Sequence, residues 1–261
     1  MSLARIRARK TPQPVPTASD GKEEYVHTLF NSIAGRYDLM NLLMTGGLVK
    51  LWHRVVMREA GVRTGTTGLD VCCGTGELAL AMAARSGDKG KITGIDFSEE
   101  MLAVAAAKIQ RRGLAGRIEL VQGNALQMPF ADNSFDCATV GFALRNVTDI
   151  PKAVAEMVRV VKPGGNVVCL DLARPANRFF QIPYRFYFYR VVPLLGRLNE
   201  RRKMPDGKPR PYTYLPNSLH TFPDQDRLAE IFREAGLCDV HYHGLAGTVV
   251  AVHTGTKPLP N

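Results

Sequence analysis

One stretch carries the strongest structural signal: Gly68-Leu69-Asp70-Val71-Cys72-Cys73-Gly74-Thr75-Gly76-Glu77-Leu78-Ala79. A short apolar run that holds an acid leads into a Gly-Thr-Gly turn, and helical spacing resumes after it. Because Gly74 and Gly76 have no Cβ, the backbone can turn sharply there and a ligand can approach it closely. In an open α/β sheet such a turn follows the first strand, at the edge where ligands bind. The stretch therefore predicts a nucleotide-type cofactor site.

The glycine spacing alone leaves the cofactor open. The Gly-x-Gly-x-x-Ala pattern also matches the loose dinucleotide fingerprint, and Asp96 follows about 20 residues later, where an NAD site has its acid. The charges favour a different cofactor, because Asp70 and Glu77 stand on either side of the turn and would repel a pyrophosphate. S-adenosylmethionine has cationic sulfonium and amino groups and no phosphate. We therefore predict S-adenosylmethionine; a tight turn without a ligand would not explain the two acids.

The composition is typical of a globular protein with one main core. The chain has 261 residues, of which 45% are hydrophobic. No apolar run approaches the roughly 18 residues of a membrane-spanning helix. The basic N-terminus runs into a proline-rich stretch without the apolar segment of a secretory signal. We expect a cytosolic protein.

The cysteines and histidines do not predict a metal site. Two of the five cysteines, Cys72 and Cys73, are adjacent, and the other three sit singly in apolar, strand-like runs. We predict buried, reduced thiols and no bound metal. Four histidines are interpreted as structural or exposed: His53, His241, His243 and His253.

The net charge of +10 belongs to two segments. Residues 1–10 carry four basic residues and no acid. Residues 172–210 carry ten Lys or Arg against two acids, a net charge of +8, so the rest of the chain sums to −2. The part from 172 to 199 holds five arginines and no acid, together with seven aromatic residues. Localised charge of this kind indicates a partner surface and says nothing about the fold.

Apolar strand-like segments alternate with helical patterns along most of the chain. The first strand ends at Val71, and the others are expected at 91–96, 118–122, 135–140, 167–172, 238–243 and 248–253. The alternation predicts a mostly parallel, doubly wound sheet. The last two strands are joined by only four residues, so they form an antiparallel hairpin. A seven-stranded sheet of this kind is unusual for a dehydrogenase and typical of a class I, Rossmann-like methyltransferase.

Three regions are predicted along the chain. Residues 1–20 are a disordered basic tail. Residues 21–60 form two helices that cap the cofactor edge of the sheet. Residues 61–261 form the methyltransferase domain, with an aromatic and basic insertion at about 174–216.

Several stretches together resemble one family, the quinone-biosynthesis C-methyltransferases that act on demethylmenaquinol or on the ubiquinone precursor. They are Arg36-Tyr37-Asp38-Leu39-Met40-Asn41, 69–76, 94–98, 123–125 with 128–130, Leu144-Arg145-Asn146-Val147-Thr148-Asp149, and 214–216 before 222–223. The resemblance covers residues 23–258, nearly the whole chain. The stretches 36–41 and 144–149 are the most specific parts of the resemblance. The glycine turn is less specific, because it is common to many methyltransferases.

The resemblance places cofactor contacts at Thr75, Asp96, Asn124 and Ala125. The glycine turn and its acid add Asp70, Gly74 and Gly76 to the residues expected to bind S-adenosylmethionine. Asp96 can accept hydrogen bonds from both ribose hydroxyls, and Asn124 with the Ala125 N–H can read the adenine edge. An ordinary turn residue is nearly as good an interpretation of Asn124.

The expected reaction needs a carbon nucleophile, which forms when a phenolic proton is removed. We expect positioning and stabilisation of the developing phenolate to supply most of the catalysis. Arg145 is the first choice to bind the phenolate oxygen, with a surface ion pair as the alternative. Asn146 orients a water or the second ring oxygen, and Tyr37 closes over the ring from the cap. Asp171 is a candidate base or a structural acid, so the base is not identified.

Glu77 is a mild departure from the usual family pattern, and the stretch 200–210 is longer and more basic than usual. Three further departures are expected to line the substrate pocket: Val49, Gly141 and Ala143. The expected function is S-adenosylmethionine-dependent C-methylation of a polyprenylated quinol, with demethylmenaquinol ahead of a benzoquinol. A methyltransferase of another lipid is the alternative, and RNA binding by the basic segments belongs to a different class. No nucleic-acid partner is expected, because the aromatic residues cluster with aliphatic ones. We expect segment 172–199 to dock peripherally on the anionic cytoplasmic membrane, and a homodimer is left open.

Overall fold

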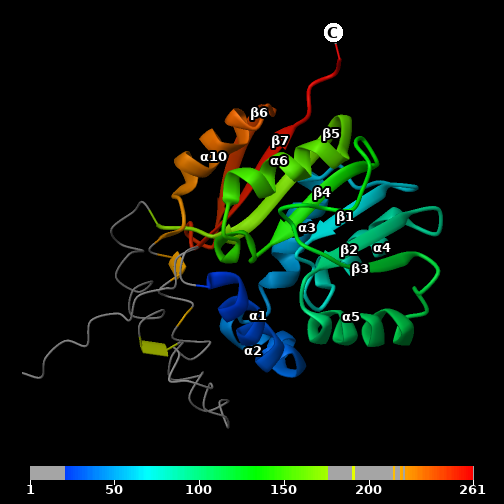
Figure 1. Cartoon of the computed structure of the whole chain (residues 1–261), viewed down its shortest axis with the longest axis vertical. Helices are drawn as coiled ribbons and strands as arrows, with labels where there is room; N and C mark the ends of the chain where they lie inside the picture. The colour runs from blue at the N-terminus through cyan, green and yellow to red at the C-terminus, as the bar shows by residue number, and fades with distance from the viewer. Residues whose placement is uncertain (1–20, 176–189, 192–213, 215–217, 220, 261) are drawn as a thin grey trace, which may run out of the picture.

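The computed structural model describes residues 21–175, 190–191, 214, 218–219 and 221–260. The predicted tail and most of the predicted insertion lie outside this part of the chain. Figure 1 shows a twisted sheet with helices packed on both faces. Within the described ranges, every helix is too short or too polar to span a bilayer.

The sheet has seven strands, in the order β3-β2-β1-β4-β5-β7-β6. Their bounds are β1 Thr67–Val71, β2 Lys91–Asp96, β3 Ile118–Gln122, β4 Phe135–Gly141, β5 Val161–Leu172, β6 Cys238–Leu245 and β7 Val250–Thr256. The first five strands are parallel, and β7 runs antiparallel to both β5 and β6. The predicted fold class is confirmed. The chain moves outward from β1 to β3 and then returns to β4 on the other side of β1, which makes the β1/β4 edge the switch point where ligands bind.

The central strands are buried on both faces. Along β5, Val167 and Cys169 belong to the core under α6 (Ile150–Val160) and α10 (Gln225–Glu234). Val168 and Leu170 alternate with them and join the core under α3 (Val49–Glu59) and α4 (Glu77–Ser86). This double burial explains why these strands read as near-continuous apolar runs in the sequence.

Side-chain caps fix where two of the helices begin. The Ser98 hydroxyl accepts a hydrogen bond from the Met101 N–H at the start of α5 (Glu99–Arg111). Asp149 accepts from the Lys152 N–H at the start of α6. Each cap satisfies one of the free N–H groups of the first helical turn. Ser98 lies two residues after the end of β2, whereas Asp149 follows a longer connection after β4, and each cap sets where its helix leaves the cofactor edge.

The N-terminal region differs from the two helices predicted. It has three, α1 (Lys22–Ile33), α2 (Tyr37–Thr45) and α3, with a short 3-10 turn η2 (Ala34–Arg36) before α2. Gly35 lies inside this 3-10 turn. In Figure 1, α1 and α2 lie together at one end of the sheet. α3 packs on the sheet through Trp52 and Val56.

Two further details correct the expectations. β5 begins at Val161, six residues early, because residues 161–165 continue the strand beyond an irregularity in its pairing with β4. Among the cysteines, Cys238 is exposed at the edge strand, whereas Cys73, Cys137 and Cys169 are buried as predicted. The apolar pattern around Cys238 does not reveal that β6 is an edge strand with one open face.

Candidate active site

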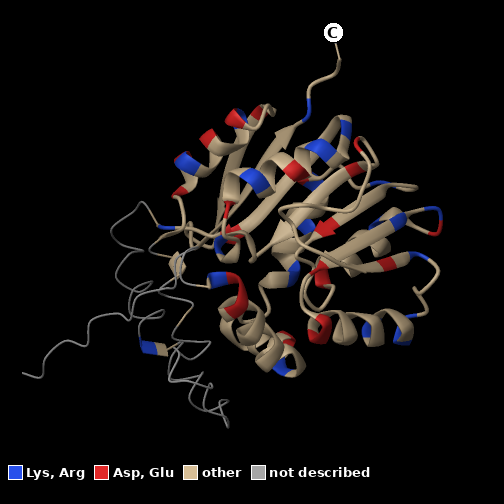
Figure 2. Cartoon of the chain, in the orientation of Figure 1, with Lys and Arg blue, Asp and Glu red and all other residues tan. Residues whose placement is uncertain are grey.

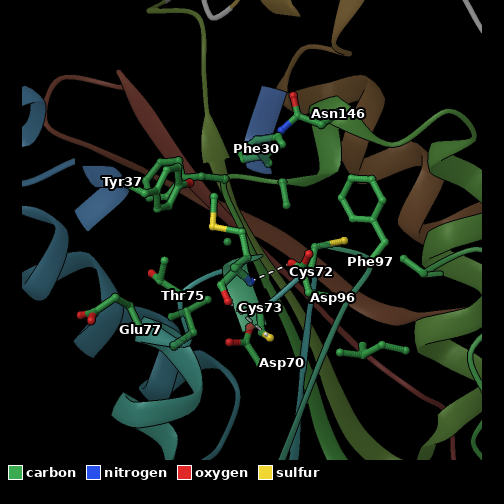
Figure 3. Close-up of a pocket in the computed structure, with 18 of the residues that line it drawn as sticks. Phe30, Tyr37, Asp70, Cys72, Cys73, Thr75, Glu77, Asp96, Phe97 and Asn146 are labelled. Carbon is green, nitrogen blue, oxygen red and sulfur yellow. Dashed lines mark hydrogen bonds between the residues drawn. The ribbon is translucent and has the colours of Figure 1, made fainter. Parts of the chain in front are cut away.

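A cavity of about 360 Å³ lies at the carboxyl ends of β1, β2 and β4, in the size range of small-molecule sites. The strand ends and the loops after them form its floor, and residues of α1, α2 and α3 form its roof. Figure 3 shows Asp70, Asp96 and Thr75 on one side, with Phe30, Tyr37 and Asn146 across from them. The predicted cap and cofactor loop therefore enclose one space.

The glycine turn lines this cavity and has a left-handed backbone conformation that few residue types adopt. Gly74 and Gly76 have φ of 52° and 80°, in the left-handed region that glycine tolerates. The Gly74 N–H donates to Asp96 Oδ2 at 2.7 Å, so the loop after β1 is tied to the end of β2. Cys72 also has a left-handed φ of 52°. The sequence does not predict this, because cysteine has no preference for that region.

Asp96 fits the role of the ribose acceptor. Its side chain is buried, and its Oδ1 accepts from the Ser98 N–H at 2.9 Å. Burial raises its pKa despite these backbone N–H groups. Each carboxylate oxygen has two lone pairs. After the contacts to Gly74 and Ser98, both oxygens retain acceptor capacity at the cavity.

Asp70 brings a second buried acid to the floor. Its Oδ2 accepts from the Ala79 N–H at 2.9 Å, and Thr139 Oγ1 donates to its Oδ1 at 3.3 Å. Burial, together with the nearby charge of Asp96, raises the pKa of Asp70 to about 7. A cationic ligand next to it would favour the ionised carboxylate. The acid therefore both holds the start of α4 and suits a positively charged, phosphate-free cofactor.

A polar network joins the glycine loop to the cap. Thr75 Oγ1 donates to Asp38 Oδ1 at 2.6 Å, and Lys108 Nζ donates to Asp38 Oδ2 at 2.7 Å. Lys108 is buried and also forms an ion pair with Glu77. The positive charge of Lys108 offsets the negative charge of Glu77. Asp70 therefore favours a cationic cofactor more than Glu77 does. Sequence reasoning did not identify Lys108, which lies in a polar stretch of α5 and resembles a surface lysine.

The part of the cavity around Asn124 and Ala125, where adenine contacts were expected, departs in part from the expectation. Asn124 and Ala125 line it, but Asn124 Oδ1 accepts from the Leu126 N–H at 2.9 Å. This is the contact of an ordinary turn residue, which was the alternative interpretation. Phe97 also lines the cavity, with its ring 5.3 Å from that of His27. Phe97 was missed, although an aromatic residue directly after the acid of β2 was a usable signal.

Asn146 stands out on the opposite wall. It ends the 3-10 turn η3 (Leu144–Asn146), is only 7% exposed and lines the cavity. Neither its Nδ2 nor its Oδ1 has a hydrogen-bond partner within the described part of the chain. A buried polar group without a partner costs about 1–3 kcal/mol. Its amide is therefore available to a bound ligand.

Tyr37 lies on the same side, and its ring makes an edge contact with Phe30 at 6.1 Å. Burial raises its pKa, although a hydrogen bond with Asn41 and the charge of Arg145 act in the other direction. The three positions that depart from the family pattern line the cavity, as expected: Val49, Gly141 and Ala143.

Arg145 lies in the wall behind Asn146. Its Nη1 donates to Asp171 Oδ1 at 2.7 Å and to the Phe142 carbonyl at 2.5 Å. Both members of this ion pair are buried, and neither is among the residues that line the cavity. The apolar neighbours of Arg145 correctly indicate burial. They do not indicate that Asp171 already takes up its charge.

The sequence and the fold match known methyltransferases. A family model described as the ubiE/COQ5 methyltransferase family matches residues 18–257. A protein of Desulfitobacterium hafniense (strain Y51) named demethylmenaquinone methyltransferase is 48% identical over 237 residues, 91% of each chain. One of the same name from Geobacillus kaustophilus (strain HTA426) is 44% identical, over 90% of this chain and 98% of that one.

Solved structures agree on the fold. A SAM dependent methyltransferase from Aquifex aeolicus has a TM-score of 0.55 at 22% identity, covering 78% of this chain and 88% of that one. The [4+2]-cyclase SpnF has a TM-score of 0.62 at 20% identity, covering 97% and 100%. Because the same fold also occurs in a cyclase, the fold alone does not determine the reaction, which depends on the residues of the site.

Proposed function

The chain belongs to the ubiE/COQ5 methyltransferase family, which makes it an S-adenosylmethionine-dependent methyltransferase, and from that premise we propose its substrate. The substrate is a polyprenylated quinol, demethylmenaquinol, and the methyl group goes to a ring carbon in menaquinone biosynthesis. The names of the relatives support this substrate. The observation that carries the proposal is the unpartnered Asn146 amide, buried in the wall opposite the glycine loop.

S-adenosylmethionine supplies an electrophilic methyl group when it is bound. Four groups of residues would hold it. Asp96 would accept from the ribose hydroxyls, and an ionised Asp70 would favour the cationic part. The Gly74–Gly76 turn would let the backbone approach the ligand closely, and Phe97 and Ala125, which line the cavity, would contact the adenine.

The quinol ring lies between this cofactor and the cap. When the phenolic proton leaves, Asn146 Nδ2 donates to the developing phenolate, and its Oδ1 remains free to accept from the second hydroxyl. The Tyr37 hydroxyl is protonated at neutral pH, and burial raises its pKa further, so it can donate a hydrogen bond to the ring from the cap. Donors fixed in place before the charge develops are the most effective way to stabilise it.

We assign Arg145 a positioning role in this reaction in place of direct contact with the phenolate. Its ion pair with Asp171 holds the turn that carries Asn146, and its guanidinium adds positive potential near Tyr37. Asp171 Oδ2 is buried without a partner among the described residues. Because Asp171 does not line the cavity, we do not assign it as the base.

Purified protein with labelled S-adenosylmethionine and two reduced quinones tests the substrate. We expect turnover with demethylmenaquinol, and kcat/KM at least about tenfold lower with the 2-polyprenyl-6-methoxy-1,4-benzoquinol of ubiquinone biosynthesis, because one misfitting ring group costs roughly 1–3 kcal/mol. A preference for the benzoquinol would overturn the choice of ring. Methyl transfer to a phospholipid and to neither quinol would overturn the proposal that the substrate is a quinol.

We further propose that the protein docks on the cytoplasmic membrane to collect this substrate. Five leucines around the α2–α3 corner are between 43% and 56% exposed: Leu39, Leu42, Leu43, Leu48 and Leu51. Leu42 also lines the cavity, so the exposed apolar face is continuous with the site. α2 carries only one charged residue, whereas Figure 2 shows both signs on α5 and α10. An apolar face of this kind beside a site for a lipid-tailed quinol suits a bilayer.

Co-sedimentation with anionic and neutral liposomes tests the docking. The L39S/L43S/L51S variant should bind anionic vesicles less and keep its affinity for S-adenosylhomocysteine. The matched control is L259S, because Leu259 is 72% exposed near the other end of the chain. A second variant, R185E/R190E, tests whether the basic segment 172–199 also contributes to membrane binding. If it does, the binding that remains in this variant should not depend on salt. Equal binding to neutral vesicles, or none to either, would contradict the proposal. Whether the protein forms a homodimer stays open, and light scattering tests it.

A further inference from the structure

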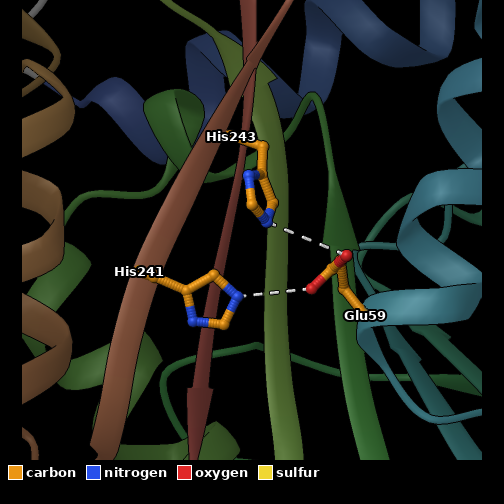
Figure 4. Close-up of side chains that lie close together, drawn as sticks. All are labelled: Glu59, His241 and His243. Carbon is orange, nitrogen blue, oxygen red and sulfur yellow. Dashed lines mark hydrogen bonds and ion pairs between the residues drawn. The ribbon is translucent and has the colours of Figure 1, made fainter.

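Glu59, His241 and His243 form a cluster far from the cavity, which we call the edge cluster. Glu59 ends α3, and the two histidines lie on β6, the last strand of the sheet. His241 Nε2 is 3.3 Å from Glu59 Oε2, His243 Nε2 is 4.0 Å from Glu59 Oε1, and one ligand atom from each of the three residues lies within 4.8 Å of the other two. Figure 4 shows both imidazoles pointing from the strand toward the carboxylate. None of the three lines the cavity.

The strand presents the two histidines on one face. Residues two apart on a strand share a face, and the residue between them points the other way. Tyr242 confirms this, because its hydroxyl donates to Asp226 on α10 and its ring lies 5.0 Å from that of His253. An irregularity in the pairing with β7 precedes His241, and such bulges re-aim side chains.

The hydrogen bond on the far side of His241 fixes its tautomer. Its Nδ1 lies 2.8 Å from the Asp239 carbonyl oxygen, which can only accept, so Nδ1 carries the proton. In the neutral ring, Nε2 is then a bare acceptor, and it faces a carboxylate oxygen, a second acceptor. Two acceptors at this distance need a cation or a proton between them. A backbone carbonyl on Nδ1 is also the usual support of a histidine that binds a metal through Nε2.

We propose that the edge cluster binds one divalent transition-metal ion of the Zn²⁺ class. Two imidazoles and one carboxylate are a common zinc ligand set, with water in the fourth position. Bonds of about 2.0–2.1 Å in a tetrahedron place ligand atoms about 3.3–3.4 Å apart, close to the His241–Glu59 spacing. Mg²⁺ and Ca²⁺ prefer oxygen ligands, so the two nitrogens exclude them.

The neighbours of the cluster leave room for such an ion. The Arg58 guanidinium pairs with Glu59 Oε1 through Nε and Nη2, which leaves Oε2 for the metal. The imidazole side chains are 48% and 51% exposed, so His243 can turn inward by the small distance required. A bound ion would fasten the edge strand to α3, whose first residue, Val49, lines the cavity. This inference does not depend on the proposed substrate.

Titration calorimetry of the tag-free protein with ZnCl₂ tests the site, with MgCl₂ as the comparison. We expect one Zn²⁺ per chain and no response to Mg²⁺. H241A, H243A and E59Q should each weaken binding by about tenfold or more, since even supporting groups are worth that much. C238S is the matched control, because Cys238 is an exposed ligand type on the same strand; its affinity should equal that of the wild type.

Long-range ¹H–¹⁵N spectra of the histidine rings give a second readout that does not depend on folding of the variants. Zn²⁺ should shift the Nε2 resonances of His241 and His243 and leave those of His27 and His53 in place. The proposal is overturned if Zn²⁺ does not bind, if C238S removes the binding, or if saturating Zn²⁺ leaves both Nε2 resonances unchanged because a proton alone bridges His241 and Glu59.

Discussion

Asn146 is the residue whose loss should affect the chemistry most directly. Its amide is buried in the cavity wall with no partner among the described residues. Removing one donor to a developing oxyanion typically costs about 10²–10³ in kcat. We expect N146A to lose turnover in this range and to bind S-adenosylhomocysteine as the wild type does. Steady-state methyl transfer and calorimetry measure the two effects separately.

The N146D variant sharpens this test. A carboxylate at the same place would repel the phenolate that the amide is proposed to stabilise, so its turnover should fall below that of N146A. Activity of N146D equal to that of the wild type, with intact binding of S-adenosylhomocysteine, would remove Asn146 from the mechanism.

The pKa of Asp70, about 7, makes cofactor binding depend on pH. A cationic ligand binds the ionised carboxylate better, so affinity is full above pH 7 and falls as the acid takes up its proton below it. Linkage predicts an affinity for S-adenosylmethionine about tenfold weaker at pH 6 than at pH 8. S-adenosylhomocysteine lacks the sulfonium charge and should show a smaller change. Calorimetry at several pH values measures both.

The D70N variant is the control for this dependence. Its amide oxygen can still accept from the Ala79 N–H, so the start of α4 keeps its hydrogen bond. Most of the pH dependence between 6 and 8 should disappear, together with part of the affinity. If D70N keeps the full slope, the titrating group lies elsewhere, and the buried neighbour Asp96 is the next candidate.

At the scale of elements, Lys108 holds the cap against the cofactor loop through Asp38 of α2 and Glu77 of α4. K108M leaves the two carboxylates facing each other without their shared cation. We expect α2 to exchange amide hydrogens faster and the affinity for S-adenosylhomocysteine to fall several-fold, about 1 kcal/mol. Hydrogen exchange over residues 37–45 and calorimetry measure the change.

The exposed Lys152 at the start of α6 provides the matched variant K152M. It removes the same charge from a helix that does not hold the cap. If K108M and K152M show the same exchange over α2, the ion pairs of Lys108 do not keep the cap closed.

The same elements show what sequence patterns can and cannot predict. β1, β2 and β3 end where the sequence predicts. A buried parallel strand is an apolar run, and an acid or another polar residue shows where that run stops. α2 was missed because only three residues separate it from α1 and only three from α3, so no long loop marks its ends in the sequence. Lys108 and Asp171 were not predicted as partners of Asp38 and Arg145, since those pairs join residues 70 and 26 positions apart.

For the whole molecule, the sheet topology follows from the order of strand and helix, and the cofactor edge follows from the topology. Asp70, the glycine turn and Asp96 converge there, as the sequence predicts. The opposite wall depends on how the cap folds back over this edge. Arg145 and Asn146 are neighbours in one sequence motif, so the sequence could not tell which of the two faces the cavity. Only the turn of η3 directs the Asn146 amide to the cavity and the Arg145 guanidinium into the wall, where it pairs with Asp171.

The central claim is that this cavity transfers a methyl group to a carbon of a quinol ring. The most direct measurement uses ¹³C-methyl S-adenosylmethionine with reduced demethylmenaquinol and reads the product by NMR. A methyl group on carbon and one on oxygen have well-separated ¹³C shifts. The account predicts a single ring C–CH₃ signal, formed by the wild type and at least about 10²-fold more slowly by N146A. An O–CH₃ signal, or a C–CH₃ signal that forms equally fast in N146A, would contradict it.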